Sequence, residues 1–488
     1  MSDTTDLRRR AAAGTKWGFV GTGGSQAVRF GVGLLLARIL GPDAFGVVAA
    51  ALVFTNFIAL FLDQGLSVTL VRRTEASDAF VATVRWLNIV STVLLAALTF
   101  ALAQEVARFF GTPELAEVLR WMALFVLLQG ATIIPRAVLA RRLDFKSVAK
   151  ADLVGASIGG GVALAAAGAG AGYWALVVQS TVSAGATALV LTVFAGRIPF
   201  RPRLQLLPEI ASFSTRLLAG SIFNYASRNL DNAIVGRLFG PRDLALYSLS
   251  YRTLMVPVMV LGQVANSVAL PVYARLQRDR TALRRYYLLG NRVIAITALP
   301  AMTLVIVEAD PLVRVVFGEA WVPAVLTMQI LAVTGMRQSI QTTIVPLVAA
   351  LGDARWLMRW NIGSSVVYVA SFFVGASWGI EGVAAAYTVV GLCISPIPAA
   401  KAASALEFSL RDYATALVPA FSTSLAMAMA LVASGWGVTH VLGGGPVVEL
   451  GVGLVVGIAV YLACLRWVWK DASSELLRAM RLVLARGD

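Results

Sequence analysis

Apolar stretches of about 20 residues recur along nearly the whole chain, from near Trp17 to near Trp469, and that is the length an α-helix needs to cross a bilayer. Hydrophobic residues make up 58% of the chain and charged residues only 14%, against about 25% charged in soluble domains. Barrel strands would instead be about 10 residues of alternating polarity. The sequence therefore predicts an all-α polytopic membrane protein.

We predict about 14 transmembrane helices, and the loops between them alternate in charge. One set of loops is rich in Lys and Arg and the other is nearly free of them. Because positive loops stay in the cytoplasm, both termini are predicted to be cytoplasmic, and the net charge of +15 reflects topology, not nucleic-acid binding. The predicted spans lie near residues 15–40, 45–71, 80–103, 117–139, 150–169, 172–195, 212–239, 244–270, 287–309, 322–348, 360–378, 380–402, 412–434 and 447–469.

Two parts of the chain share one pattern. The first copy reads RFGVGLLLARILGPDAFG from Arg29, and the second reads RNLDNAIVGRLFGPRDLA from Arg228. Arg29, Arg38, Gly41 and Gln64 each have an identical residue 199 positions later. Six spans per copy is an even number, so both copies enter the membrane from the same side, which predicts parallel repeats about an axis along the membrane normal.

This repeat predicts two six-helix lobes followed by a further helix pair. The predicted parts are an N-terminal lobe (1–196), a cytoplasmic linker (197–211), a C-terminal lobe (212–402), two additional transmembrane helices (403–470) and a basic cytoplasmic tail (471–488).

Arg29 and Arg228 lie near the middle of their spans, where a guanidinium in hydrocarbon costs roughly 2.5 kcal/mol or more. Two interpretations stand. Each arginine forms a structural ion pair, with Asp231 the partner for Arg228 and Asp63 the nearest acid in sequence for Arg29, or each contacts an anionic substrate. Guanidinium suits phosphate because its planar fork bonds bidentately and keeps its charge.

The seventh predicted span is unusually polar, with Asn224, Arg228 and Asp231 on one helical face. That stripe lines either a wet cavity or another helix. Asp231 has no acidic counterpart in the first copy, so it is either a coupling-ion site or a salt-bridge partner of Arg228. Gln64 and Gln263 occupy matching positions and either line the same cavity or bond between helices.

The tenth span carries a second polar cluster, MRQSIQTT, in which Arg337 is a third candidate for anion contact. Two cysteines and one histidine give no metal-ligand spacing, so no metal site is expected. No Walker motif occurs, no nucleophile elbow or HExxH lies in any sizeable loop, and the loops are too short for a catalytic domain. We therefore expect no enzyme activity, no catalytic residues and no cofactor.

Three segments carry a family resemblance: ARILGPDAFG, LDQGLSVTLVRR and, in the second copy, RLFGPRDLALYSLSYR. They resemble the polysaccharide and oligosaccharide flippases (Wzx-type) of the MATE-like superfamily, most of all the polysaccharide-synthesis subgroup. The resemblance implies a MATE-like V of two lobes in the bacterial inner membrane. It also implies a central cationic cavity that receives the diphosphate of an undecaprenyl-linked oligosaccharide, with Arg29 and Arg228 at the matching positions.

The resemblance leaves several functions open. The implied partners are the lipid-linked oligosaccharide, membrane lipids and a polysaccharide polymerase. A lipid II flippase and a cation-coupled multidrug antiporter are alternatives with the same fold, although midplane arginines favour an anionic substrate. A non-transporting scaffold for polymerases is the alternative of another class.

Overall fold

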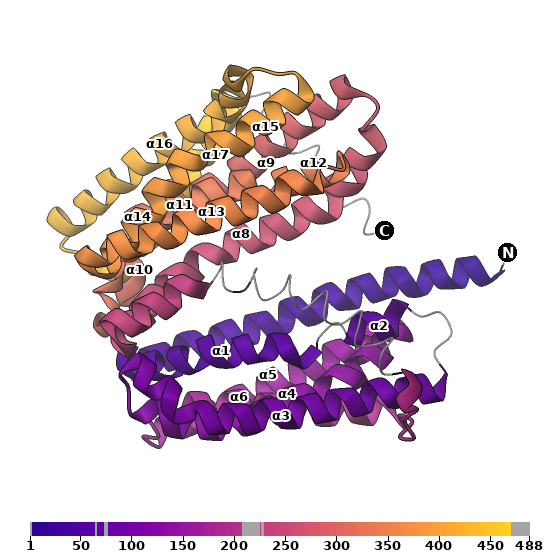
Figure 1. Ribbon diagram of the computed structural model, residues 1–488. Helices are drawn as coiled ribbons and strands as arrows, with labels where there is room; N and C mark the ends of the chain where they lie inside the picture. The colour runs from indigo at the N-terminus through magenta and orange to yellow at the C-terminus, as the bar shows by residue number, and fades with distance from the viewer. Residues whose placement is uncertain (1, 64–65, 73–76, 207–224, 226–228, 470–488) are drawn as a thin grey trace. The chain divides into compact units, whose positions relative to one another are not determined.

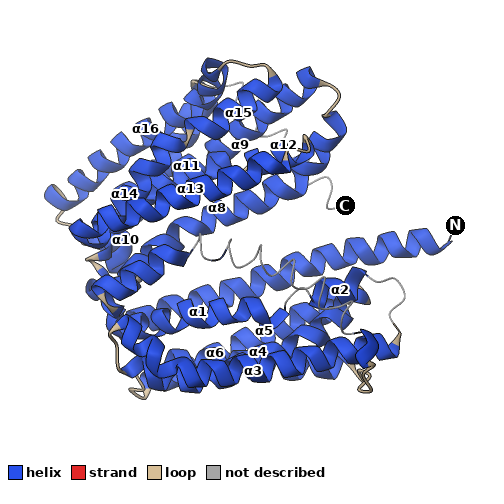
Figure 2. Cartoon of the chain, in the orientation of Figure 1, coloured by secondary structure: helices blue, strands red, loops and turns tan. Residues whose placement is uncertain are grey.

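A computed structural model of the chain describes residues 2–63, 66–72, 77–206, 225 and 229–469 (Figure 1). Helices connected by short loops are the regular structure there, and no strand occurs among these residues (Figure 2). The chain divides into two compact units, Met1–Ala245 and Leu246–Asp488. The all-helical architecture predicted from the apolar stretches is confirmed for the described residues.

The first unit is built from long helices, with a helical segment at 229–239 before α8. Its elements are α1 (Ser2–Asp63), α2 (Leu66–Arg72), α3 (Asp78–Phe110), α4 (Glu114–Arg141), α5 (Phe145–Gly168), α6 (Trp174–Ala195), η1 (Leu204–Leu206) and the beginning of α8 (Pro241–Leu276).

Small residues allow close helix packing between α5 and α6 in this unit. A methyl group on Gly155 would lie 2.0 Å from Thr187 Oγ1, and one on Gly159 would lie 2.7 Å from Ser183 Cβ. Close approach of backbones at small residues is how helices associate where lipid removes the hydrophobic drive between them. The glycine-rich segment is therefore a packing surface.

The two predicted repeat copies meet at their Gly-Pro turns within the first unit. Gly41 and Gly240 have φ of +71° and +87°, a left-handed conformation that favours glycine, and each precedes a proline that begins the next helix. Arg242 Nη1 lies 3.8 Å from Asp43 Oδ2. A methyl group on Gly46 would lie 1.9 Å from the Pro241 carbonyl oxygen, so Gly46 lets the second helix of α1 pass the start of α8.

The second unit contains the rest of α8 and the helices that follow it. These are α9 (Arg280–Val307), α10 (Ala309–Val316), η2 (Glu319–Trp321), α11 (Ala324–Gln341), α12 (Ile344–Ala350), α13 (Ala354–Gly375), η3 (Ala376–Trp378), α14 (Gly379–Ile394), α15 (Pro396–Leu406), α16 (Leu410–His440) and α17 (Pro446–Trp467).

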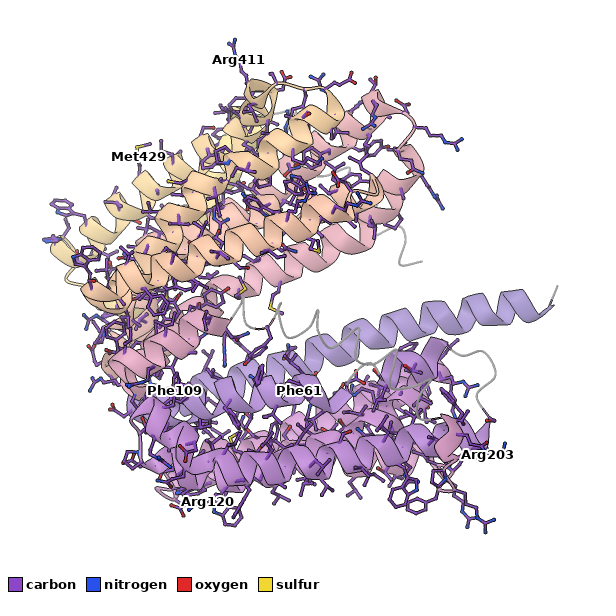
Figure 3. The ribbon with its side chains drawn as sticks, in the orientation of Figure 1. Phe61, Phe109, Arg120, Arg203, Arg411 and Met429 are labelled. Carbon is purple, nitrogen blue, oxygen red and sulfur yellow. The ribbon has the colours of Figure 1, made fainter. Side chains whose placement is uncertain are left out.

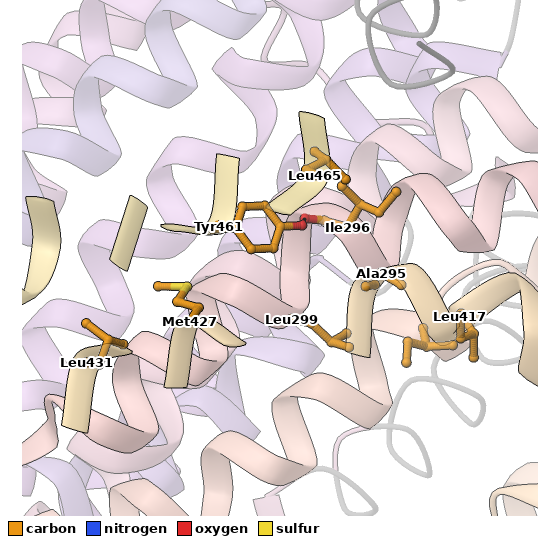
Figure 4. Close-up of a cluster of buried hydrophobic side chains, with 10 residues drawn as sticks. Ala295, Ile296, Leu299, Leu417, Met427, Leu431, Tyr461 and Leu465 are labelled. Atoms are coloured by element: carbon orange, nitrogen blue, oxygen red, sulfur yellow. Dashed lines mark hydrogen bonds between the residues drawn. The ribbon is translucent and has the colours of Figure 1, made fainter. Parts of the chain in front are cut away.

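The last two helices pack against α9 and build one core with it (Figure 4). Leu299 from α9, Leu431 from α16 and Leu465 from α17 are each at most 3% exposed in this cluster. Tyr461 donates a hydrogen bond of 2.5 Å from its hydroxyl to the Ile296 carbonyl oxygen, which satisfies a polar atom in an apolar setting. The helix pair predicted to lie outside the repeat is thus an integral part of this unit.

Large apolar side chains cover the outward faces of several helices, as expected for surfaces that meet lipid. Met429 is 62% exposed and points away from α16 (Figure 3). Charged side chains gather at the ends of the helices, where Arg203 and Arg411 extend away from them (Figure 3).

Nine helical segments among the described residues are long and apolar enough to cross a membrane. Two of them, Gly23–Asp63 and Ala354–Leu406, each contain two predicted spans, because the helix continues across a kink or short turn. The predicted span 212–239 lies largely outside the described residues, and the predicted spans 244–270 and 322–348 are not among the nine. The chain is a multi-pass helical membrane protein, and the count of 14 and the lobe boundaries stay predictions.

Candidate functional site

Arg337 of α11 is a charged side chain inside the helices of the second unit. It is partly buried, and its Nη1 donates to Gln341 Oε1 at 3.0 Å, one helical turn away. Its Nε is buried and has no hydrogen-bond partner within the part of the chain that the structure describes. A guanidinium has five N–H donors, so Arg337 retains donors for a further acceptor.

Two tyrosines complete the polar lining around Arg337. The Tyr368 side chain of α13 interacts electrostatically with Arg337. Its ring lies 4.7 Å from the ring of Tyr387 on α14, centroid to centroid, and the Tyr387 hydroxyl accepts from Gln338 Nε2 at 2.9 Å. Three helices therefore contribute to one aromatic and polar cluster.

Gly391 of α14 makes the space in which the Arg337 guanidinium lies. A methyl group there would be 2.8 Å from Arg337 Nε and 2.9 Å from Cζ. These distances are shorter than van der Waals contact, so only glycine leaves room for the side chain in this position. The guanidinium is held between α11 and α14, with its orientation set by Gln341 and by this gap. We name Arg337, Gln341, Tyr368, Tyr387 and Gly391 the Arg337 cluster.

Arg29 of α1, in the first unit, has an exposed side chain within a helix of high hydropathy. No described acidic side chain forms an ion pair with it. On the same helix, methyl groups on Gly31 or Gly33 would meet nothing within 4 Å, so α1 is loosely covered beside Arg29. The exposed Arg29 side chain is therefore accessible to a partner from outside the first unit.

Asp63, the acid nearest to Arg29 in sequence, is engaged locally at the end of α1. Its Oδ1 accepts from the Ser67 backbone N–H at 2.9 Å and its Oδ2 from the Ser67 hydroxyl at 2.6 Å. This arrangement bridges α1 and α2 and uses Asp63 to cap α2.

Asp231 lies in the helical segment 229–239 and is 4% exposed. Its Oδ1 accepts from Asn232 through the backbone N–H at 2.8 Å and the side-chain amide at 3.3 Å. Arg228, its predicted partner, lies outside the described residues, as do Asn224 and Gln64. Gln263 is in α8, and its side chain is not among those described. The assignment of these residues to a site stays a prediction.

An open, largely apolar cavity of about 450 Å³ lies in the first unit between the second part of α1, α3, Tyr225 and residues 229–233. Tyr225 fixes one wall, because its hydroxyl donates to the Val53 carbonyl oxygen at 2.7 Å and its ring lies 5.9 Å from that of Phe57. Phe109 and Glu105 of α3 form another wall. The cavity joins aromatic surface to two polar side chains, Glu105 and Asn229.

The side chains of the Arg337 cluster suit anion binding better than catalysis. Arg337 offers fixed donors beside tyrosine hydroxyls, a set that recognises oxyanions. No group of three or more His, Cys, Asp and Glu side chains that would hold a metal occurs among the described residues.

The sequence pattern singled out Arg337 but missed its surroundings. Tyr368, Tyr387 and Gly391 lie 31 or more residues beyond it in sequence, and nothing in their local spacing points to an arginine on another helix. Their convergence depends on how α11, α13 and α14 pack.

Comparison with known proteins places this architecture in a family. Residues 35–326 match the family model described as polysaccharide biosynthesis protein. The succinoglycan biosynthesis transport protein ExoT of Rhizobium meliloti (strain 1021) is 27% identical over 379 residues, covering 78% of this chain and 76% of ExoT. The teichuronic acid biosynthesis protein TuaB of Bacillus subtilis (strain 168) is 24% identical over 98% of this chain and 99% of TuaB. The lipopolysaccharide biosynthesis protein WzxC of Escherichia coli (strain K12) is 25% identical over 79% of each chain.

Solved structures share the fold at low sequence identity. The lipid II flippase MurJ in an inward closed conformation aligns with a TM-score of 0.73 at 13% identity, covering 93% of this chain and 99% of MurJ. An inward-facing multidrug resistance MATE family transporter of the MOP superfamily aligns with a TM-score of 0.63 at 15% identity, covering 79% and 96%. The chain thus belongs to the polysaccharide biosynthesis protein family, as the resemblance of its sequence motifs predicted, and its fold is similar to those of the MurJ and MATE structures.

Proposed function

We propose that this protein is a flippase that moves a polyprenyl-diphosphate-linked oligosaccharide from the inner to the outer leaflet of the bacterial inner membrane. The observation that carries the proposal is the Arg337 cluster, an incompletely bonded guanidinium held inside an apolar helical unit. Family membership supports a role in transport for polysaccharide synthesis rather than an enzymatic one.

The chemistry of the substrate explains why arginines serve this function. A diphosphate leaving water for a membrane interior loses strong hydration, and an unpaired charge there is very costly. Arginine donors replace water at the phosphate oxygens and remain charged at any physiological pH. The sugar portion finds hydroxyl and aromatic surface at Tyr368 and Tyr387, and the prenyl tail stays in lipid.

The proposed cycle is alternating access. Arg29, Arg228 and Arg337 contact the diphosphate on the cytoplasmic side, and movement of the two lobes then exposes it outward. An undecaprenyl carrier, a polymerase that receives the product and cytoplasmic termini belong to this proposal. Asp231, Asn224, Asp63, Gln64 and Gln263 are the proposed polar residues of the pathway, with Asp231 the candidate for ion coupling.

The test is polysaccharide export by single variants at equal membrane abundance. Arg337→Ala should lower export about tenfold or more, since charge-assisted hydrogen bonds contribute roughly 1.5–3 kcal/mol. Arg337→Lys keeps the charge but loses the planar fork, so export should recover only in part. Arg411→Ala, an arginine that extends from the end of a helix in the same unit (Figure 3), is the matched control and should export normally.

Arg29→Ala should likewise block export, with Arg120→Ala as the matched exposed control in its own unit. Lipid-linked oligosaccharide should accumulate on the inner leaflet in the blocked strains. Normal export by Arg29→Ala and Arg337→Ala together would exclude the proposed anion site and favour a scaffold. Loss of cationic-dye efflux without loss of export would favour the antiporter.

A further inference from the structure

Glu308 is a buried acid at the junction between α9 and α10 and is not part of the Arg337 cluster. Its residue is 2% exposed, and its carboxyl Oε2 has no hydrogen-bond partner among the described residues. A buried ionised carboxylate without a partner carries a large free-energy cost. The environment of Glu308 therefore favours its neutral, protonated form.

α17 forms a cradle for this carboxyl group. A methyl group on Gly453 would lie 2.4 Å from Glu308 Oε1 and 2.7 Å from its Cδ. The carboxyl therefore lies against the backbone of α17, in space that only a glycine leaves. On the same helix, a methyl group on Gly451 would meet nothing within 4 Å, so the close fit is specific to position 453.

A second carboxylate, Glu449, shares this region. It lies one turn before Gly453 on α17, so the two positions are on the same helical face. Its charge interacts unfavourably with Glu308. A methyl group on Gly435 of α16 would lie 3.2 Å from Glu449 Oε1, so Glu449 also packs against a neighbouring helix. The negative charge of Glu449 therefore adds to the effect of burial in favouring the protonated form of Glu308.

Arg314 and His440, on the neighbouring α10 and α16, have partners of their own. Arg314 of α10 bonds Asp310 at 2.8 Å from Nε to Oδ2, and it also bonds Glu319. His440, at the end of α16, stacks on Trp436 and bonds the Thr439 hydroxyl at 2.8 Å. No third His, Cys, Asp or Glu among the described residues joins the pair as a metal ligand.

We propose that Glu308 and Glu449 form a proton-binding site that holds α17 against the α9–α10 junction, in addition to any anion site. Burial first, and the charge of Glu449 second, raise the pKa of Glu308 to about 7. The unfolded chain releases this proton near 4.5, whereas the folded chain retains it until about pH 7. Stability therefore falls as pH rises from about 4.5 to about 7 and changes little from this group above that range.

Infrared pH titration of the full-length protein in lipid nanodiscs tests the site directly. A protonated carboxyl C=O band should disappear near pH 7 in the wild type. It should be absent in Glu308→Gln and should shift to lower pH in Glu449→Gln, where the neighbouring charge is removed. His440→Gln, a control variant at the end of α16, should leave the band unchanged. A wild type without the band, or a band that persists in Glu308→Gln, overturns the proposal.

The cradle has its own matched pair of variants. Gly453→Ala should push the carboxyl toward water and lower the midpoint of the band, whereas Gly451→Ala should not move it. If both variants fold and their carboxyl bands have the same titration midpoint, the proposed contact between the carboxyl group and position 453 is contradicted. If Gly453→Ala does not fold, thermal unfolding of Glu308→Gln decides instead, because it should lose the fall in stability between pH 4.5 and 7. A midpoint that depends on sodium when compared with choline identifies a metal-cation site and rejects the proton site.

Discussion

At the residue scale, glycines mark where this protein brings helices and charged groups closest. Gly391 leaves room for the Arg337 guanidinium, Gly453 for the Glu308 carboxyl and Gly46 for the carbonyl of Pro241. In each case the neighbour is a polar group. Because glycine has no side chain, a charged group or a backbone carbonyl can lie directly against the helix at that position. Other glycines, such as Gly33, face open space and make no such contact.

Gly46→Ala should destabilise the protein by about 1–3 kcal/mol, because the added methyl group collides with backbone, which cannot rotate away. The measurement is the thermal unfolding midpoint in detergent. Gly33→Ala in the same helix is the control and should be neutral or slightly stabilising, since alanine is the better helix former. Equal effects at both positions would contradict the close approach of α1 and α8.

At the element scale, a buried polar cluster joins three helices of the second unit. Asn291 of α9 is fully buried, and its Oδ1 accepts from the hydroxyls of Thr343 at 3.0 Å and Tyr413 at 3.3 Å. Its Nδ2 donates to the Tyr287 carbonyl oxygen at 2.8 Å. Hydrogen bonds of this kind fix the relative rotation of helices that apolar packing alone leaves poorly specified.

Asn291→Ala should lower stability by about 1–3 kcal/mol, because it leaves buried hydroxyls without an acceptor. The double variant Asn291→Ala with Thr343→Val should be less destabilised than the sum of its parts, since both partners are then removed. Thermal unfolding of the four proteins in a double-mutant cycle measures this coupling. Additive effects would show that the two side chains act independently.

Ser409 begins α16 with a capping box, in which its hydroxyl accepts from the Asp412 backbone N–H and Asp412 accepts from the Ser409 backbone N–H. Arg284 of α9 also bonds Asp412 at 2.9 Å. Ser409→Ala should cost about 1 kcal/mol and Asp412→Ala more, since aspartate serves both the cap and α9. Thermal unfolding compares them, and a larger loss for Ser409→Ala would reject this assignment.

At the scale of the whole molecule, the alternation of basic and acidic loops predicts which residues each side of the membrane exposes. Starting from a chain with both cysteines, Cys393 and Cys464, replaced by alanine, His440→Cys should react with a membrane-impermeant maleimide on intact cells. Arg203→Cys and Arg411→Cys should react only after permeabilisation. Labelling of Arg203→Cys or Arg411→Cys on intact cells would reject the even number of predicted spans between each of these positions and the cytoplasmic termini.

Much of this architecture can be predicted from the sequence because the bilayer interior offers no water to hydrogen-bond the backbone. Apolar stretches must become helices whose backbone bonds are satisfied internally, so the helical class and most helix positions are readable from hydropathy. The Gly-Pro turns at Gly41 and Gly240 are equally local, because glycine adopts positive φ and proline begins a helix. The family assignment rested on these turns and was confirmed.

Other features were not readable because they depend on which helices become neighbours. Glu308 and Glu449 lie at the ends of the predicted spans 287–309 and 447–469, and nothing in the sequence brings them together, yet packing buries Glu308 against Gly453. Asp63 appears as a counter-charge for Arg29, yet it bonds Ser67, four residues away.

The sequence by itself determined that this chain crosses a membrane many times as helices, carries arginines within them and belongs to its family. Hydropathy and turn conformation depend on residues that are close together in the chain, so the sequence alone is enough to predict them. The tertiary structure alone decided that Gly391 and two tyrosines surround Arg337, that the last two helices complete the core around α9, and that one acid loses contact with water. Burial and hydrogen-bond partnership arise between residues far apart in sequence, and only packing brings those residues together.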